Sequence, residues 1–192
     1  MDMFAKEKND FLHKKDKSKK GEIDKDIVPL VNFINSLNDF YTTSSCAGRI
    51  VLLEMKSGKK NGCEWLISKH SKVKSSEIIK VLRTSKSKNV VWFKQQPVIM
   101  HVACRNMENA LKLLNLSRQV FKRCGIITIT QKKAMVEIIG SENLDTIVRD
   151  RTFTAGDNYL KKIVYYANRN FGTNRGKIDK ICSILKNSFK NG

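Results

Sequence analysis

The sequence predicts an α+β fold in which the hairpins of a mixed β-sheet are interspersed with helices. Short apolar runs rich in Val, Ile and Leu recur in pairs, and apolar residues at helical spacing follow each pair. A Rossmann fold is excluded, because no GxGxxG loop follows a predicted strand and no Walker sequence is present. The two-strands-then-helix rhythm is compatible with an internal structural duplication. We expect a single domain over residues 1–192, with residues 1–15 as a flexible N-terminus.

The period of the apolar residues predicts the individual elements. A first helix is expected over residues 26–40, where apolar residues recur every three to four positions and Pro29 falls in the first turn. Residues 42–47 are small and polar, and they lead into the apolar run at 50–53. The other predicted elements are strands at 50–53 and 63–68 around a turn at 57–62, a helix at 75–83, strands at 90–93 and 98–104, a helix from the cap Asn106 to Arg123, a hairpin of 125–130 with 134–139, and two closing helices from Asp157 and Thr173.

The net charge of +19 is concentrated in two segments. Residues 55–95 carry eleven basic residues against two acidic ones, and residues 149–192 carry ten against three. A surface that binds nucleic-acid phosphates needs such clustering, because each neutralised phosphate releases counterions. A solvent face decorated with lysine is the alternative, but the localisation of the surplus favours nucleic acid.

Cysteine and histidine usage argues against a disulfide framework and a metal site. The five cysteines are widely spaced without a CxxC pair, and the three histidines show no ligand spacing. The N-terminus lacks the apolar centre of a signal peptide, and no apolar run approaches the roughly 20 residues of a membrane span. We therefore expect reduced thiols, no metal and a cytoplasmic location.

Residues 42–49 are the most unusual stretch, with four hydroxyls, a thiol, a glycine and an arginine before an apolar strand. Such groups can surround a polar ligand, and Arg49 can bind a carboxylate or phosphate through two hydrogen bonds. A polar connector whose serines cap local turns is the alternative. Cys46 has no base beside it in the sequence, which favours a packed thiol over a nucleophile.

The strand predicted over residues 98–104 directs His101 to one face, together with Arg105 just beyond its end. The two-residue period gives one face Ile99, His101, Ala103 and Arg105, and the other face Val98, Met100, Val102 and Cys104. A polar pair at the end of a strand can form the edge of a site. A hydrogen-bonded structural histidine is the alternative.

Several blocks in register resemble the tRNA wybutosine-synthesising methyltransferase family. They are residues 16–24 (DKSKKGEID), 41–50 (YTTSSCAGRI), 97–105 (PVIMHVACR) and 121–126 (FKRCGI), followed by Tyr159-Leu160, Ala167-Asn168 and Asn174 in the final helices. The resemblance runs from about residue 16 to the last helix. Three positions depart from it: Gln96 stands where the family usually has Glu, Lys122 where it has Arg, and Cys124 where it has Ser. Lysine lacks the planar fork of arginine, and a thiol is a weaker donor than a hydroxyl.

The resemblance implies a function and a site. It implies methyl transfer from S-adenosylmethionine to N-4 of the tricyclic wyosine-type base beside the anticodon of tRNA-Phe, in wybutosine biosynthesis. The expected catalytic residues are His101, Ser45 and Cys46, with His101 accepting the proton or positioning the base. The expected cofactor-binding residues are Ser44, Gly48, Arg49, Arg105, Gly125, Asn168 and Asn174. The basic segments 56–94 and 149–190 are expected to hold the anticodon arm.

Two other functions remain open at this point. A noncatalytic tRNA-binding module of the same fold would follow if the changes at Gln96, Lys122 and Cys124 disabled transfer. A cysteine-based transfer through Cys46 would require a covalent protein–RNA adduct.

Overall fold

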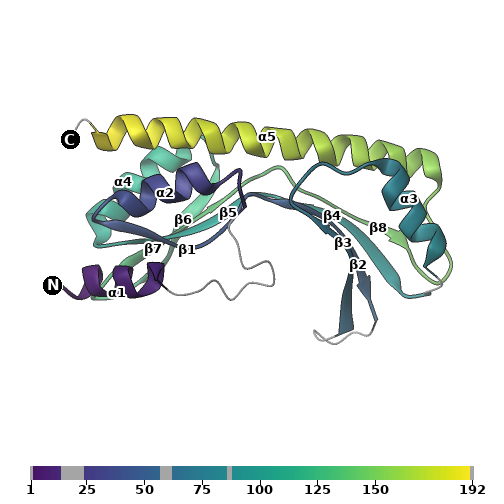
Figure 1. Cartoon of the computed structure of the whole chain (residues 1–192), viewed down its shortest axis with the longest axis horizontal. Helices are drawn as coiled ribbons and strands as arrows, with labels where there is room; N and C mark the ends of the chain where they lie inside the picture. The colour runs from purple at the N-terminus through teal and green to yellow at the C-terminus, as the bar shows by residue number, and fades with distance from the viewer. Residues whose placement is uncertain (1, 14–23, 57–61, 86–87, 191–192) are drawn as a thin grey trace. The chain divides into compact units, whose positions relative to one another are not determined.

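The computed structural model describes residues 2–13, 24–56, 62–85 and 88–190 (Figure 1). Its helices are α1 (Met3–Leu12), α2 (Val28–Ser36), α3 (Ser75–Thr84), α4 (Met107–Arg118) and α5 (Asp157–Lys190). Its strands are β1 (Phe40–Cys46), β2 (Arg49–Met55), β3 (Cys63–Lys69), β4 (Val90–Gln96), β5 (Ile99–Cys104), β6 (Arg123–Ile129), β7 (Ala134–Ile139) and β8 (Leu144–Arg149). The α+β class expected from the sequence is confirmed. No helix in this described part of the chain is long and apolar enough to cross a membrane.

The chain divides into two compact units, each assembled from separate stretches. Unit 1 comprises residues 1–47, 98–141 and 175–192, and unit 2 comprises residues 48–97 and 142–174. Unit 1 contains the sheet β1-β5-β7-β6 and unit 2 the sheet β3-β2-β4-β8, and every described strand pair is antiparallel. A four-stranded sheet in each unit fits the repeated rhythm of the sequence, although the strand orders differ. The single domain over residues 1–192 stays a prediction.

The two faces of the unit 1 sheet are covered by different helices. Apolar residues of α2, α4 and the second half of α5 pack against the face that carries Met100, Val102 and Val136. The other face receives α1, whose Phe4 packs with Tyr41 and Ala103. Figure 1 shows α1 on the opposite side of this sheet from α2 and α4. The structure thus has a helix over most of the N-terminal stretch for which the sequence predicts flexibility.

The core of unit 2 lies between its sheet and the helices α3 and α5. Leu52 and Phe93 of the sheet pack in one cluster with Ile78 of α3 and Leu160 of α5. The buried guanidinium of Arg149 donates to the carbonyl oxygens of Leu82 and Ser85, at 3.0 Å for Ser85. It therefore satisfies carbonyls that are left without partners at the C-terminal end of α3.

The polar connector that stood as the alternative for residues 42–49 is wrong. Most of the stretch belongs to β1, an edge strand that pairs with β5 and shifts register between Thr42 and Ser44. Threonine is β-branched and fits an extended strand, and an edge strand tolerates exposed hydroxyls. Polar composition alone could not distinguish such a strand from a loop.

The two helices expected at the C-terminus are a single helix, α5, so the predicted break at Thr173 is also wrong. Gly172 lies inside it, and the Thr173 hydroxyl donates to the Arg169 carbonyl, four residues earlier, at 3.3 Å. A helical glycine costs about 1 kcal/mol relative to alanine. Packing offsets this cost on both sides of the glycine, since Phe171 is buried in the core of unit 2 and Ile178 in that of unit 1.

The remaining predictions differ from the structure mainly at element ends. The first helix is shorter than expected, and Pro29 does lie in its first turn. Asn106 caps α4 as predicted, since its side chain accepts from the Asn109 amide at 2.9 Å. The hairpin β6–β7 is confirmed, whereas α1 and β8 are additional elements. The block at residues 16–24 and the turn at 57–62 lie largely outside the described residues.

Candidate functional site

Three polar side chains form a hydrogen-bonded row across neighbouring strands of unit 1. The Ser44 hydroxyl on β1 lies 2.8 Å from His101 Nδ1 on β5, and His101 Nε2 lies 2.9 Å from Glu137 Oε1 on β7. The strand register explains the row, because Ser44 is opposite His101 and His101 is opposite Glu137. Directly opposite residues share a face of a sheet, so the three side chains meet.

The row fixes how protons are held on the imidazole of His101. An ionised Glu137 can only accept a hydrogen bond, so it accepts from Nε2–H. Nδ1 of the neutral ring is then an acceptor for the Ser44 hydroxyl. Ser44 is the exposed member, while the side chains of His101 and Glu137 are about three-tenths exposed. The arrangement can therefore take a proton from a ligand that contacts Ser44 and hold it on an imidazolium beside a carboxylate.

Other predicted residues fall on both faces of this sheet. Gly125 of β6 is opposite Glu137, and a Cβ placed on it would meet no atom within 4 Å. Cys46 shares the His101 face, because it lies opposite Ile99. Ser45 is opposite Met100, whose side chain is in the core, so the structure directs Ser45 away from His101.

The end of β1 is fixed by buried polar contacts at Ala47. The carboxylate of Asp24 accepts from the Ala47 amide at 3.0 Å, and the Arg175 guanidinium donates to the Ala47 carbonyl. Arg175 also pairs with Asp26 at 2.5 Å. Asp24 is the last residue of the block 16–24 that resembles the family, and its contact with the Ala47 amide gives it a structural role. Sequence reasoning missed Arg175, which holds the strand that carries Ser44.

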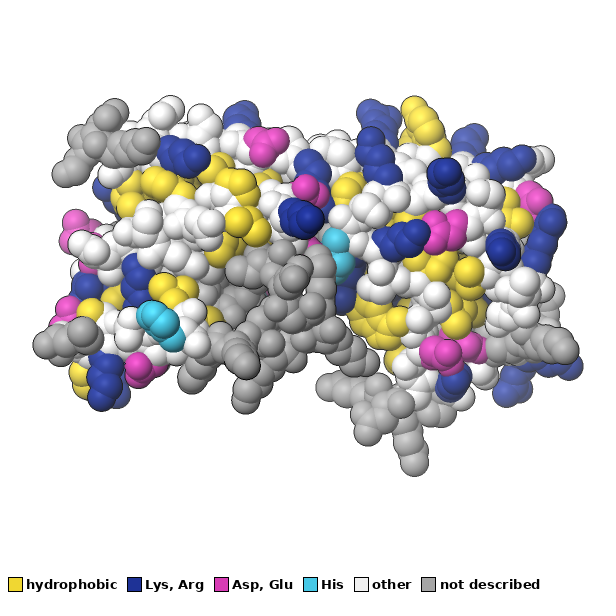
Figure 2. All heavy atoms as spheres, in the orientation of Figure 1, with side chains coloured by type: hydrophobic (Ala, Val, Ile, Leu, Met, Phe, Trp, Pro, Cys, Tyr) yellow, Lys and Arg dark blue, Asp and Glu magenta, His cyan; other side chains and the backbone are white. Residues whose placement is uncertain are grey.

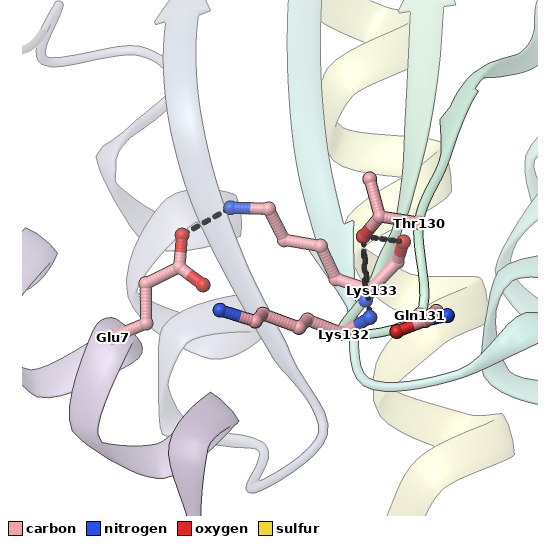
Figure 3. Close-up of a pocket in the computed structure, with 5 residues that line it drawn as sticks. All are labelled: Glu7, Thr130, Gln131, Lys132 and Lys133. Carbon is pink, nitrogen blue, oxygen red and sulfur yellow. Dashed lines mark hydrogen bonds and ion pairs between the residues drawn. The ribbon is translucent and has the colours of Figure 1, made fainter.

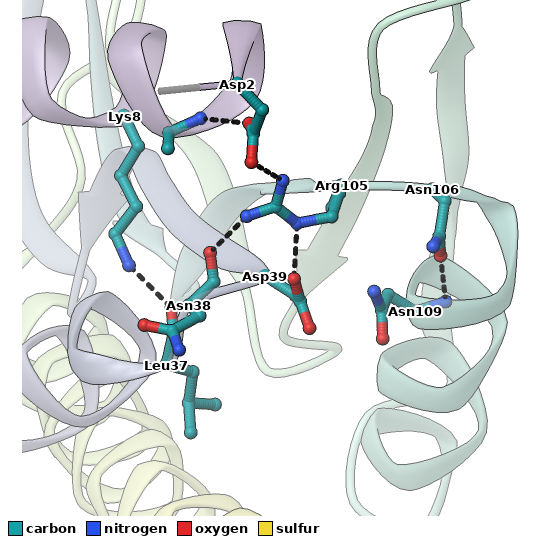
Figure 4. A network of polar contacts seen from close by, with 9 residues as sticks. Asp2, Lys8, Leu37, Asn38, Asp39, Arg105, Asn106 and Asn109 are labelled. Atoms are coloured by element: carbon teal, nitrogen blue, oxygen red, sulfur yellow. Dashed lines mark hydrogen bonds and ion pairs between the residues drawn. The ribbon is translucent and has the colours of Figure 1, made fainter.

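Arg105 connects the start of α1 to the residues just before β1 through hydrogen bonds. Its guanidinium donates to Asp39, to Asp2 at 2.6 Å and to the Asn38 carbonyl at 3.4 Å (Figure 4). It also lies 4.9 Å from the centre of the Phe4 ring. These acidic partners raise the pKa of Arg105, and the pKa of Asp2 is lowered by the Ala5 amide and by Arg105. These contacts give Arg105 a structural role that requires no cofactor.

A surface pocket beside α1 carries no catalytic arrangement. It is lined by Glu7, Thr130, Gln131, Lys132 and Lys133 (Figure 3). The Lys133 ammonium pairs with Glu7 and lies 3.2 Å from the Tyr41 hydroxyl. The pKa of Lys133 is raised by these two partners against the effect of its partial burial, so the side chain is a fixed cation that fastens α1 to the hairpin.

The predicted residues at the start of β2 belong to unit 2. Gly48 has φ +92°, and a Cβ on it would lie 2.7 Å from the Gln96 carbonyl oxygen, so only glycine fits. Arg49 Nε donates to the Gln96 side chain, which is opposite it on β4. The Arg49 guanidinium also lies 4.1 Å from the centre of the Trp65 ring. Gln96 therefore has a defined partner at the position where it departs from the family pattern.

Comparison with known proteins decides the family. The family model described as "Methyltransferase TYW3" matches residues 6–187. This chain belongs to that methyltransferase family. The resemblance expected from the sequence blocks is therefore confirmed.

Relatives of the TYW3 family cover most of the chain. One, from Pyrococcus furiosus, is 36% identical over 87% of this chain and 86% of its own length, and is named "tRNA(Phe) 7-((3-amino-3-carboxypropyl)-4-demethylwyosine(37)-N(4))-methyltransferase 1". Another, from Danio rerio, is 32% identical over 96% of this chain and 75% of its own, and is named "tRNA wybutosine-synthesizing protein 3 homolog". A solved structure of a Pyrococcus horikoshii OT3 protein matches with a TM-score of 0.83 and 32% identity, over 97% of this chain and 95% of that one.

A TYW3 methyltransferase needs S-adenosylmethionine, and two buried acceptors of unit 2 fit its donors. Gln95 and Asn174 each donate an amide N–H to the Glu142 carbonyl, at 3.0 and 3.3 Å. Their oxygens, Gln95 Oε1 and Asn174 Oδ1, are buried without a hydrogen-bond partner among the described residues. A buried acceptor left unpaired costs about 1–3 kcal/mol. The ribose hydroxyls and the ammonium group of the cofactor are donors of the required kind.

Asn168 has a different role. Its side chain accepts from the Val73 amide at 3.0 Å and donates to the Val73 carbonyl at 2.9 Å. Both ends of the amide thus bind the main chain just before α3. This double contact accounts for Asn168 as a structural residue.

Proposed function

We propose that this protein transfers a methyl group from S-adenosylmethionine to N-4 of the wyosine-type base beside the anticodon of tRNA-Phe, as a step of wybutosine biosynthesis in the cytoplasm. The names of its relatives support the substrate. The observation that carries the chemistry is the row Ser44–His101–Glu137, because a nitrogen that gains a methyl group must lose a proton.

The row supplies a path for that proton. The base N–H donates to Ser44 Oγ, the Ser44 hydroxyl passes its proton to His101 Nδ1, and Glu137 stabilises the imidazolium through Nε2–H. Ser44 and His101 are the catalytic groups in this proposal, and Glu137 positions the ring. Cys46 lies on the same face but is not needed as a nucleophile. Ser45 is left out, because it is directed to the other face.

S-adenosylmethionine, when bound, supplies a methyl group on a positively charged sulfur that a base nitrogen can attack. We propose that Asn174 and Gln95 hold its hydroxyl or ammonium donors. Gly125 leaves open space beside Glu137 for the substrate. Orientation of the reacting atoms supplies much of the rate, so each set of residues acts by holding its own reactant in a fixed orientation.

The experiment is a transfer assay with methyl-labelled S-adenosylmethionine and undermodified tRNA-Phe. Label should enter the RNA, and His101→Ala should lower kcat by about 10²- to 10⁴-fold with little change in KM for tRNA. Label confined to the free cofactor would instead favour the noncatalytic tRNA-binding module. Loss of activity in Cys46→Ser together with a covalent protein–RNA adduct would favour the cysteine route.

A further inference from the structure

The two faces of the unit 2 sheet differ in chemistry. One face carries Leu52 and Phe93, which pack against helices α3 and α5. The other carries large side chains that belong to no hydrophobic core cluster of the described residues. Figure 1 shows α3 and the first half of α5 on one side of these strands. The second face is therefore not explained by the packing of unit 2.

The strand register collects the large side chains of this face into one row. Trp65 of β3, Leu53 of β2, Trp92 of β4 and Ile147 of β8 are successive partners across the sheet. The register shift opposite Leu53 directs Trp65 outward, where it is 43% exposed. Ile147 is 38% exposed at the other end of the row. The row is thus a continuous apolar strip with an exposed indole at one edge and a second indole inside.

Two cations stand against these indoles. The Arg49 guanidinium lies 4.1 Å from the centre of the Trp65 ring, and Lys94 Nζ lies 4.9 Å from that of Trp92. Lys94 is held there by Asp145 at 2.9 Å. Such contacts keep the cations beside the ring faces. Figure 2 shows, on the visible side of the molecule, hydrophobic side chains lying among Lys and Arg.

We propose that this face, the Trp65–Trp92 strip with Arg49 and Lys94, is a stacking surface for unpaired bases of the tRNA anticodon loop. Bases in RNA loops are recognised by stacking on aromatic rings and guanidinium planes, and cations beside the rings neutralise the linking phosphates. This inference rests on the function proposed above and names a surface of unit 2 for the unpaired bases of that RNA.

Charge favours RNA over a protein partner as the occupant. The stretches that form unit 2 contain seventeen Lys and Arg against seven Asp and Glu. The centre of a protein–protein interface is apolar and depleted of charged residues. Here a cation stands beside each of the two indoles, which suits a polyanion with flat apolar bases.

The sequence offers a direct probe, because Trp65 and Trp92 are the only two tryptophans of the chain. Tryptophan fluorescence, excited at wavelengths that tyrosine does not absorb, therefore reports on this surface alone. The full-length protein is titrated, without cofactor, with an anticodon stem–loop RNA of tRNA-Phe or with a base-paired duplex of equal length. The stem–loop should quench the emission and the duplex should not. The single variants Trp65→Phe and Trp92→Phe then assign the quenching to each indole.

Affinity variants test the energy of the contact. Trp65→Ala and Trp92→Ala should each weaken stem–loop binding by about 5- to 150-fold, as expected for one lost base stack. Tyr165→Ala is the matched control, because this tyrosine of α5 in unit 2 is 64% exposed and lies on no strand of the sheet. Circular dichroism checks that each variant is folded, and Trp65→Phe should retain most of the affinity.

Unchanged stem–loop affinity in both folded alanine variants would overturn the inference, as would binding without any change of emission. A change of oligomeric state with unaltered RNA affinity would assign the face to protein contacts and overturn it as well. Failure of the proposed function is a separate result, since methyl transfer can persist without this surface. Conversely, quenching by the stem–loop with no label transferred would leave the surface standing.

Discussion

At the scale of single residues, Glu137 tests the proposed proton path most sharply, because it touches only the imidazole of that path. Glu137→Gln removes the charge that would stabilise an imidazolium but keeps a polar group of the same size. We expect kcat to fall about 10- to 100-fold, as part of the range for general base catalysis, while KM for tRNA stays within about two-fold.

Steady-state kinetics with undermodified tRNA measures both constants for Glu137→Gln. Glu108→Gln is the control, because Glu108 is an exposed acid on α4 and loses the same charge. An equal fall of kcat in both variants would mean that total charge, rather than the row, is responsible. A rise of KM alone would place Glu137 in RNA binding instead.

The residues predicted from the sequence and those found in the structure differ for a physical reason. His101 and its face were predictable, because the alternation of one strand is a local property. Glu137 was not, since its role depends on the pairing of β5 with β7, strands more than thirty residues apart. Ser44 was singled out for its composition, whereas only the register shift in β1 explains why it, rather than Ser45, faces the histidine.

At the scale of elements, two glycines of the predicted site are expected to have different roles. Gly48 is needed for the fold, and Gly125 is needed for activity. Gly48→Ala forces a side chain at φ +92° and against the Gln96 carbonyl, so it should destabilise the protein by about 1–3 kcal/mol. Gly125→Ala meets no atom within 4 Å and should change stability by less than about 1 kcal/mol. Its methyl group would stand beside Glu137, so we expect it to reduce kcat.

Urea unfolding followed by circular dichroism, combined with the transfer assay, distinguishes the two glycine variants. The prediction would be contradicted if Gly48→Ala were as stable as the unchanged protein, or if Gly125→Ala were unfolded. A folded and fully active Gly125→Ala protein would show that the substrate does not approach this part of β6.

Element types were predicted well where periodicity was strong and poorly where composition misled. The apolar face of α4 and the β6–β7 hairpin were readable from spacing and turn residues. The β1 strand was not predicted, because its hydroxyls resemble those of a loop. The break predicted at Thr173 is absent, because α5 packs in a hydrophobic core on either side of this point. Neither the division into two units nor the pairing of separate stretches has a local signal.

At the scale of the whole molecule, the surplus positive charge is not uniformly available to RNA. Arg149 and Arg175, both in the second basic segment, donate to main-chain carbonyls and are used inside their units. In the described part of the first segment, Lys72, Lys74 and Lys80 are exposed at and before α3 and form no ion pair. These three lysines are therefore the best candidates for phosphate contacts.

Changing Lys72, Lys74 and Lys80 together to Glu should weaken tRNA binding and flatten its dependence on salt. Each lost phosphate contact lowers the slope of log K against log salt concentration by roughly 0.7–0.9, so three contacts lower it by about two to three. The dissociation constant is measured by fluorescence anisotropy between roughly 50 and 200 mM salt, the range over which such contacts weaken strongly.

The matched control changes Lys112, Arg118 and Lys122 to Glu, with the same change of net charge. These three residues are exposed on and just after α4. If both triple variants lost the same slope, tRNA would be responding to total charge, and the segment before and within α3 would be an ordinary solvent face. A slope lost only in the first variant would locate the phosphate contacts on unit 2.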